Sequence, residues 1–176
     1  MSAIFVIALS LASGLAAQNP PAPTLKSILL EQLQSTHNVQ DWFVPAIKAV
    51  DGMTVDQANW KDGKGNHSVA QLVNHLTFWD KQQLAKFKGE PPPAYSGKND
   101  ETFAEVADQR AWESAVGELD RVMTEMENLI RAADDKKLAE WSSAIAHVSA
   151  HNAYHTGQIL FVRKEQGSWD PEKGVK

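Results

Sequence analysis

Three of the six histidines lie close together near the end of the chain, as His147, His151 and His155. Residues four apart share one face of an α-helix and are separated by about 6 Å along its axis. Two imidazoles at that spacing can converge on one metal ion. His147 and His155 are about 12 Å apart by the same rise, so the three cannot easily bind one ion together. The pair is therefore either His147/His151 or His151/His155.

The apolar pattern around these histidines favours the second pair. His151 and His155 fall on one helical stripe with Val148, Ile159 and Val162, which predicts that both side chains point into the core. Imidazoles in an apolar core are costly unless their nitrogens have partners, and a metal ion satisfies both at once. We therefore expect His151 and His155 to bind a divalent metal ion.

A third ligand must come from another helix, and His75 is the best candidate. It lies one turn after Leu72 and one turn before Trp79, beside the buried stripe of a second predicted helix. A simple hydrogen-bonded core histidine is the alternative at such a position. No general base is identified, so the catalytic residues stay unassigned.

The remaining histidines are expected to play other roles. His147 is expected on the surface, with a role beside the metal ligands as the alternative. His37 is expected as a hydrogen-bonded boundary residue, although it could look into the same cavity, and His67 is expected to face solvent.

Several classes of site are excluded by what the sequence lacks. Neither His-Glu-x-x-His nor Glu-x-x-His occurs, which argues against a zincin protease and against a di-iron carboxylate bundle. Without cysteine, the chain has no disulfide, no cysteine-based zinc site and no thiol nucleophile. The net charge is −5 and the basic residues are scattered, so a nucleic-acid partner is not expected.

Four amphipathic stretches must position the histidines, and strand-like alternation is absent. The first begins near Thr24 and extends to Val50, with a kink or break at Pro45. The second begins at the capping box of Ser68 and Gln71 and ends at Gly89. The third covers residues 112–133 and the fourth about 141–165, with a long crossover or lid between the second and third. This pattern predicts an all-α, single four-helix bundle.

Aromatic residues and one glycine are given structural roles. Four tryptophans fall on helical stripes and are expected in the core: Trp42, Trp79, Trp112 and Trp141. Tyr154 is expected to pack at a helix interface, with a hydrogen bond to a ligand as the alternative. Gly157 is expected to let a neighbouring helix approach closely.

The N-terminal segment has the features of an export signal. Residues 4–17 are apolar and uncharged, the first charge is Lys26, and small residues place a cleavage site near Ala16 or Ala17. The stretch is too short for a membrane span, which needs about 20 residues. We expect a signal peptide (1–17), a spacer (18–23), the bundle (24–167) and a C-terminal tail (168–176), hence a periplasmic or extracellular protein. The alternative is a buried N-terminal helix.

The motif His151-x-x-Tyr154-His155-x-Gly157-Gln158-Ile159, with His75 in a helix that begins Ser-Val-x-x-Leu-Val-x-His, resembles the DinB-like (damage-inducible) metal-binding bundle family. The resemblance extends over roughly residues 24–167. It implies a left-handed four-helix bundle in which His75, His151 and His155 bind a divalent metal ion.

The resemblance also implies the classes of metal and reaction. Zinc or nickel is expected, with iron and manganese as alternatives, and some relatives are thiol-dependent transferases or isomerases. The often basic position after the last histidine is Thr156 here, and an export signal departs from cytosolic thiol chemistry.

Three functions follow: a metal-dependent transferase or hydrolase, a non-catalytic metal- or small-ligand-binding module of the cell envelope, or a purely structural bundle. The expected partner is a small molecule, and homodimer formation is left open.

Overall fold

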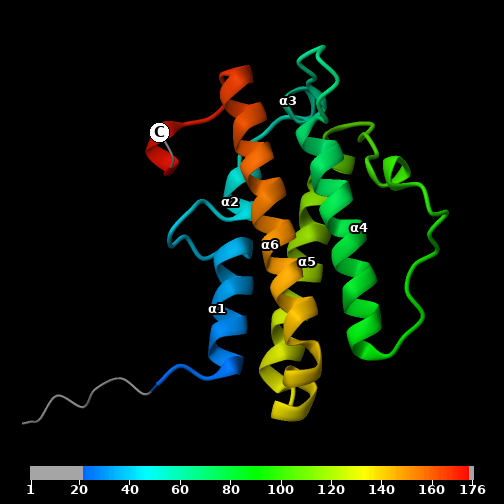
Figure 1. Ribbon diagram of the computed structural model, residues 1–176. Coiled ribbons are helices and arrows are strands. Elements are labelled where there is room, and N and C mark those ends of the chain that lie inside the picture. Colours follow the sequence, from blue (N-terminus) through cyan, green and yellow to red (C-terminus); the bar gives the residue numbers. More distant parts are fainter. Residues whose placement is uncertain (1–21, 175–176) are drawn as a thin grey trace, which may run out of the picture.

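The computed structural model describes residues 22–174, and this part of the chain contains helices and loops but no strand (Figure 1). The predicted signal peptide and most of the spacer lie outside the described residues. The elements in chain order are α1 (Leu25–His37), α2 (Ala46–Val50), α3 (Val55–Asn59), α4 (Val69–Lys88), η1 (Asn99–Thr102), α5 (Gln109–Ala132), α6 (Asp135–Gln166) and η2 (Pro171–Lys173).

The four long helices form the predicted bundle. α1 packs against α5 and α6, and α4 packs against the same two helices. Figure 1 shows that α4 and α5 run in one direction while α1 and α6 run in the other. None of the described helices combines the length and the apolar character that crossing a bilayer requires.

The ends of α4 are those that the sequence predicts. The Ser68 hydroxyl accepts a hydrogen bond from the backbone N–H of Gln71, and the Gln71 side chain accepts one from the backbone N–H of Ser68. Gly89 ends the helix in the left-handed conformation, with φ of 77°. Gly167 ends α6 in the same way, with φ of 75°.

The connection from α4 to α5 is a crossover rather than a lid over one end. Residues 89–108 return alongside α4 to the end where this helix begins, which lets α5 run parallel to it (Figure 1). The one-turn helix η1 lies in this crossover and contacts α4.

The first predicted helix is interrupted over a longer segment than expected. α1 already ends at His37, and Pro45 is the N-cap residue of the separate helix α2. Because Trp42 lies in the loop between them, its predicted place on a helical stripe is wrong, and its side chain is 91% exposed. The expected loop of residues 53–66 contains the short helix α3.

The last helix begins earlier than predicted. The aspartates that were expected to follow the third helix instead start α6, because the Asp134 carboxylate accepts a hydrogen bond from the backbone N–H of Lys137. Only the turn around Ala133 separates α5 from α6.

The apolar core consists of two clusters. Along α4 the first cluster ends at Leu76 and the second begins at Leu84, and along α6 they are separated between Val148 and Ile159. Buried polar side chains fill the middle of the bundle between these positions, including His75, Asp80, Asn152 and His155. The candidate functional residues therefore lie between the two apolar clusters.

The predicted C-terminal tail packs on the bundle as far as residue 174. The buried guanidinium of Arg163 donates to the carbonyl oxygens of Ala49 at 2.7 Å and Ser168 at 2.8 Å. Trp169 is buried, and Lys173 forms an ion pair with Asp51 at 2.9 Å. This segment covers the end of the bundle at α2.

Candidate metal centre

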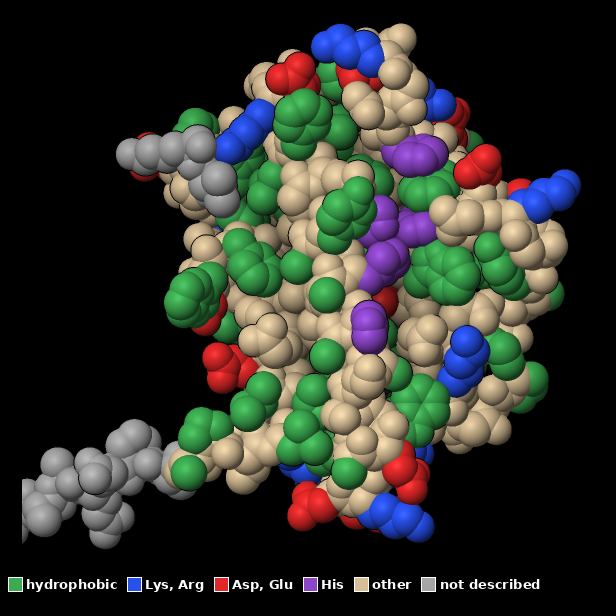
Figure 2. All heavy atoms as spheres, in the orientation of Figure 1, with side chains coloured by type: hydrophobic (Ala, Val, Ile, Leu, Met, Phe, Trp, Pro, Cys, Tyr) green, Lys and Arg blue, Asp and Glu red, His purple; other side chains and the backbone are tan. Residues whose placement is uncertain are grey.

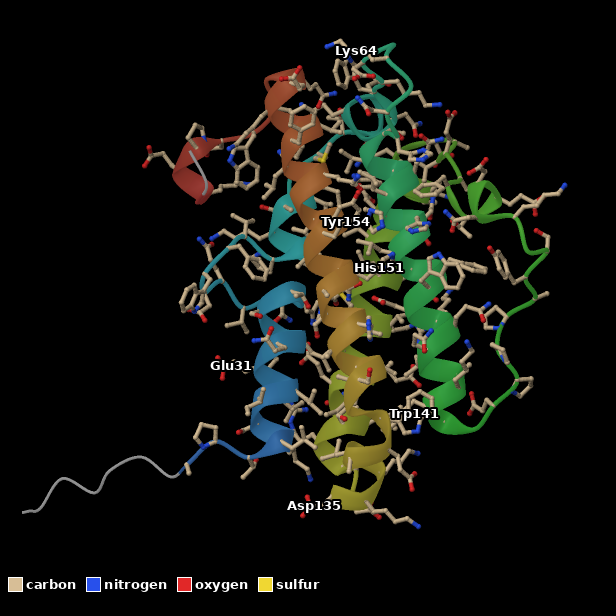
Figure 3. All side chains as sticks on the ribbon, viewed as in Figure 1. Glu31, Lys64, Asp135, Trp141, His151 and Tyr154 are labelled. Atoms are coloured by element: carbon tan, nitrogen blue, oxygen red, sulfur yellow. The ribbon has the colours of Figure 1, made fainter. Side chains whose placement is uncertain are left out.

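The three predicted ligands come together from two helices. His75 lies on α4, and His151 and His155 lie one turn apart on α6. One nitrogen from each ring lies within 4.8 Å of the others, and Nε2 of His75 is 3.2 Å from Nε2 of His151. Figure 2 shows histidine side chains gathered on one face over α4 and α6, and Figure 3 places His151 between these helices. We call this group the histidine triad.

Hydrogen bonds fix which nitrogen of His75 carries its proton. The Thr102 hydroxyl donates to the carbonyl oxygen of Asn99 at 2.6 Å, so toward Nδ1 of His75, also at 2.6 Å, it can only accept. Nδ1 therefore bears the hydrogen. The lone pair of Nε2 is left to face the other two histidines, as metal coordination requires.

His155 is oriented in a similar way by its own helix. Its Nδ1 lies 2.6 Å from Oε1 of Gln158, while Nε2 of Gln158 donates to the Tyr154 hydroxyl at 3.3 Å. The amide oxygen accepts the proton of Nδ1, so Nε2 of His155 is also unprotonated. Two of the three ligands thus have a preset tautomer.

The surroundings keep the triad neutral. Burial, followed by the neighbouring imidazoles of His155 and His151, lowers the pKa of His75 to about 3. Burial and His155 lower the pKa of His151 to about 4, and burial lowers that of His155. Neutral imidazole is the form that binds a metal ion, so the residues present fit the group that the sequence predicts.

The triad supplies three protein ligands and no more. Among the described residues, no carboxylate belongs to the group of side chains that meets there. His75 and His155 are buried, whereas His151 is half-buried and also borders a cavity of about 430 Å³ between α4 and α6. Three ligands with an accessible side are typical of catalytic rather than structural metal sites.

The crossover contributes residues that the sequence did not identify. Besides Thr102, it places the Phe103 ring in parallel contact with His75, at 4.0 Å between ring centroids. His67 stacks on the other face of Phe103 at 3.7 Å and is exposed, as expected. Among the residues that contact the triad, only Gln158 could have been identified from the sequence, because it lies three positions after His155 and therefore on the same helix face.

His147 lies outside the triad. It is exposed, as predicted, and its Nδ1 donates to the carbonyl oxygen of Ser143 at 2.8 Å. It also borders the 430 Å³ cavity, one turn before His151.

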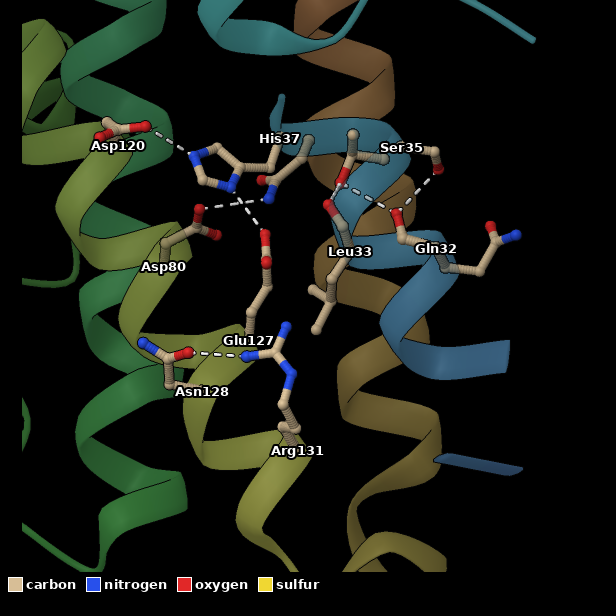
Figure 4. Close-up of polar contacts among 11 residues, drawn as sticks. Gln32, Leu33, Ser35, His37, Asp80, Asp120, Glu127, Asn128 and Arg131 are labelled. Carbon is tan, nitrogen blue, oxygen red and sulfur yellow. Dashed lines mark hydrogen bonds and ion pairs between the residues drawn. The ribbon is translucent and has the colours of Figure 1, made fainter. Parts of the chain in front are cut away.

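His37 is hydrogen-bonded as expected, but it is not a boundary residue. Its side chain is 1% exposed and lies between Glu127 and Asp120 of α5, at 2.6 and 2.9 Å (Figure 4). Burial acts to lower its pKa, but the hydrogen bonds and charges of the two carboxylates outweigh burial and raise the pKa above its usual value. His37 is therefore an ion-pair partner, separate from the triad.

A second buried polar pair lies between α4 and α6. Asp80 accepts a hydrogen bond from Nδ2 of Asn152 at 3.2 Å, and both side chains are buried. Burial raises the pKa of Asp80 to about 7, although Asn152 and the nearby His37 partly oppose the shift. The sequence analysis did not identify either residue.

Two residues of the α6 motif differ from their predicted roles. Tyr154 does not pack at a helix interface, because its side chain is 64% exposed. Its ring makes a T-shaped contact with His155 of the same helix, at 4.9 Å between centroids. Gly157 does not allow a close helix approach, since a Cβ atom there would meet nothing within 4 Å.

Comparison with known proteins identifies the architecture. A family model described as the DinB superfamily matches residues 46–159, from the start of α2 into the second half of α6, and this region includes the whole triad. No curated protein matches the chain significantly. No solved structure does so either.

Proposed function

The chain belongs to the DinB superfamily, and we propose that it holds one divalent metal ion with His75, His151 and His155. The observation that supports this most strongly is the convergence of three imidazole nitrogens within 4.8 Å from two helices. Hydrogen bonds to Thr102 and Gln158 hold the protons of two rings on the opposite nitrogens. A purely structural bundle has no need of that arrangement.

The ligand set favours zinc or nickel. Imidazole is a ligand of intermediate softness that suits zinc, nickel, copper and iron, whereas carboxylate and carbonyl oxygens suit magnesium and calcium. No oxygen ligand belongs to the triad among the described residues. Iron and manganese are the alternatives, and metal supply decides among ions that one site accepts.

We propose a metal-dependent transferase or hydrolase as the activity of this centre. A bound ion of this type acts as a Lewis acid and lowers the pKa of a water or thiol bound to it. The chain's own contribution is to hold three neutral rings in place, to leave the side near His151 open and to border that side with a cavity. The open side is what admits a substrate.

A non-catalytic metal- or ligand-binding module is the second candidate. It is favoured by the composition of the triad, which includes no carboxylate that could act as a general base, among the residues that the structure describes. Turnover of ester, amide or thiol-transfer substrates by the metal-loaded protein distinguishes the two candidates.

The metal is tested by elemental analysis of natively purified protein. We expect about one zinc or nickel ion per chain, loss of the metal in a His151→Ala, His155→Ala variant, and retention in His147→Ala, a matched exposed histidine on the same helix. Chelation should lower the Tm of the wild type and leave that of the double variant unchanged. Equal metal content in all three proteins would refute the site.

We propose in addition that the protein is exported. The support is the uncharged, apolar composition of residues 4–17 and the small residues at the end of this stretch. N-terminal sequencing of the mature protein should find a start near Gln18, and Ile7→Lys with Leu9→Lys should retain the protein in the cytoplasm. An intact N-terminus in the purified wild type would contradict export.

A further inference from the structure

We propose that the cavity beside His151 is the ligand pocket of the metal centre, and that Asp80 selects a small amphipathic amine there. The ligand class is a compact apolar ring or chain that carries an ammonium group. The inference rests on the proposed metal centre, because His151 belongs both to the triad and to the wall of this cavity.

The cavity has the size and place of a ligand site. Its volume of about 430 Å³ lies within the range of about 300–1,000 Å³ that small-molecule sites occupy. It lies between α4 and α6, the two helices that supply the triad. A ligand bound there would lie against His151.

One wall is apolar and rigidly held. It is formed by the ring of Trp79 and by Ala144 and Val148. The Trp79 ring makes T-shaped contacts with the rings of His75, at 6.4 Å, and Tyr95, at 5.3 Å between centroids. A fixed aromatic face next to small side chains accommodates a flat ring or a short alkyl chain.

The acidic member of the lining, Asp80, is hydrogen-bonded to an amide that lies outside the lining. The buried carboxylate of Asp80 receives a hydrogen bond from the Asn152 amide. Oδ1 of Asn152 is in turn the one buried polar side-chain atom without a hydrogen-bond partner in residues 22–174. A buried carboxyl group that lines the cavity and receives one hydrogen bond is better explained by a ligand than by stability, since an apolar residue would pack there at lower cost.

Charge determines which ligand group belongs at this position. Asp80 is the only carboxylate in the lining, which includes no lysine or arginine, and its other titratable members are His151 of the triad and the exposed His147. His37 lies near Asp80 but is already paired with Glu127 and Asp120. The carboxylate therefore lacks a cation of its own, and an ammonium group supplies one while an anionic ligand is repelled.

Three probes of similar shape test the selection: 2-phenylethylamine, 2-phenylethanol and 3-phenylpropionate. Their affinities are measured by titration calorimetry at pH 8, with zinc-loaded protein and with protein stripped of metal. We expect the amine to bind at least tenfold more tightly than the carboxylate in the protein stripped of metal, with the alcohol between them, whereas in the zinc-loaded protein the ion can bind the carboxylate probe and narrow this preference.

Variants separate the pocket from the metal centre. Asp80→Asn should abolish the preference for the amine, and Glu140→Gln, an exposed carboxylate on α6, should leave it unchanged. Ala144→Phe fills the cavity but leaves the Asp80 carboxyl group in place. It should weaken the binding of all three probes at least tenfold. It keeps the test decisive if Asp80→Asn fails to fold.

The outcomes distinguish the two proposals. Metal uptake without any preference for the amine would overturn the amine selection and leave the metal centre standing. An amine preference that depends on Asp80, in protein that takes up no metal, would support the amine site and overturn the metal centre. Equal binding of all probes to wild type and Ala144→Phe would overturn the pocket itself.

Discussion

Thr102 accepts a hydrogen bond from Nδ1 of His75 across 2.6 Å, although the two residues lie 27 positions apart. Thr102 belongs to the crossover, and its hydroxyl proton is committed to Asn99. The crossover therefore does more than connect α4 to α5. It sets the tautomer of one of the three proposed metal ligands.

Replacing Thr102 with valine should weaken metal binding while the fold persists. The change keeps the shape of the side chain but removes the acceptor, so the His75 ring loses its preferred orientation and tautomer. Loss of such a partner typically costs about 10- to 100-fold in metal affinity. Competition with a chromophoric chelator measures the change. Thr102→Ser, which retains the hydroxyl, should bind nearly as tightly as wild type, and equal affinity in Thr102→Val would show that the hydrogen bond is irrelevant to the site.

Asp80→Asn should reduce the loss of folding stability that accompanies a rise in pH. Burial raises the pKa of Asp80 in the folded state to about 7 from its ordinary value of 3.8, so the folded state holds this proton more tightly than the unfolded state does. Stability linked to Asp80 is therefore full below pH 3.8 and is lost as the pH rises toward 7. Between pH 5 and 8 the loss is about 3 kcal/mol.

Urea denaturation of wild type and Asp80→Asn at pH 5 and pH 8 measures that difference. The free energy of unfolding of the variant should rise relative to that of the wild type between pH 5 and pH 8. The nearby His37 is present in both proteins, so its titration largely cancels. A constant difference between the two proteins across this range would mean that Asp80 is already ionised at pH 5.

His37→Leu should destabilise the bundle by about 3–5 kcal/mol at pH 6. The substitution leaves Glu127 buried without its cation, and the lost partner of a buried ion pair carries this penalty. Because the pKa of His37 is raised in the folded state, its contribution to stability is full below its ordinary pKa of 6.5 and is lost as the pH rises through the folded-state pKa. The deficit of the variant should accordingly be smaller at pH 9.

The double variant His37→Leu, Glu127→Leu provides the control for this pair. Removing both charges should recover most of the lost stability, because apolar replacements of a buried pair are often neutral. If the double variant is as unstable as the single one, packing around residue 37 and not charge pairing is the cause.

The sequence was sufficient to predict the triad because its signals are local. Two histidines four positions apart on an apolar stripe are both expected to face the core. The Ser68 cap indicates where the helix that carries His75 begins. The partners of the triad depend on tertiary contacts. Thr102 reaches His75 only because the crossover returns along α4, which no short-range pattern specifies.

Two predictions about where helices end are wrong, and each has a physical cause. The sequence predicts a kink or break of the first helix at Pro45, yet the chain already leaves the helix after His37, whose ring is held by Asp120 and Glu127 of α5. Trp42 is exposed for that reason. The sequence analysis places the end of the third helix at Asp134, although an aspartate favours the N-terminus of the next helix equally well.

Gly157→Ala should stabilise the protein by about 0.5–1 kcal/mol, because glycine in a helix interior costs roughly that much relative to alanine. Gly157 has an ordinary helical backbone, and an added Cβ would meet nothing within 4 Å. Calorimetry should show a rise in Tm of about 1–4 °C with unchanged metal content. Gly89→Ala is the matched contrast, since φ of 77° there disfavours a side chain, and it should lower the Tm. A loss of stability in Gly157→Ala would restore the sequence-based expectation that this glycine faces a closely packed neighbour.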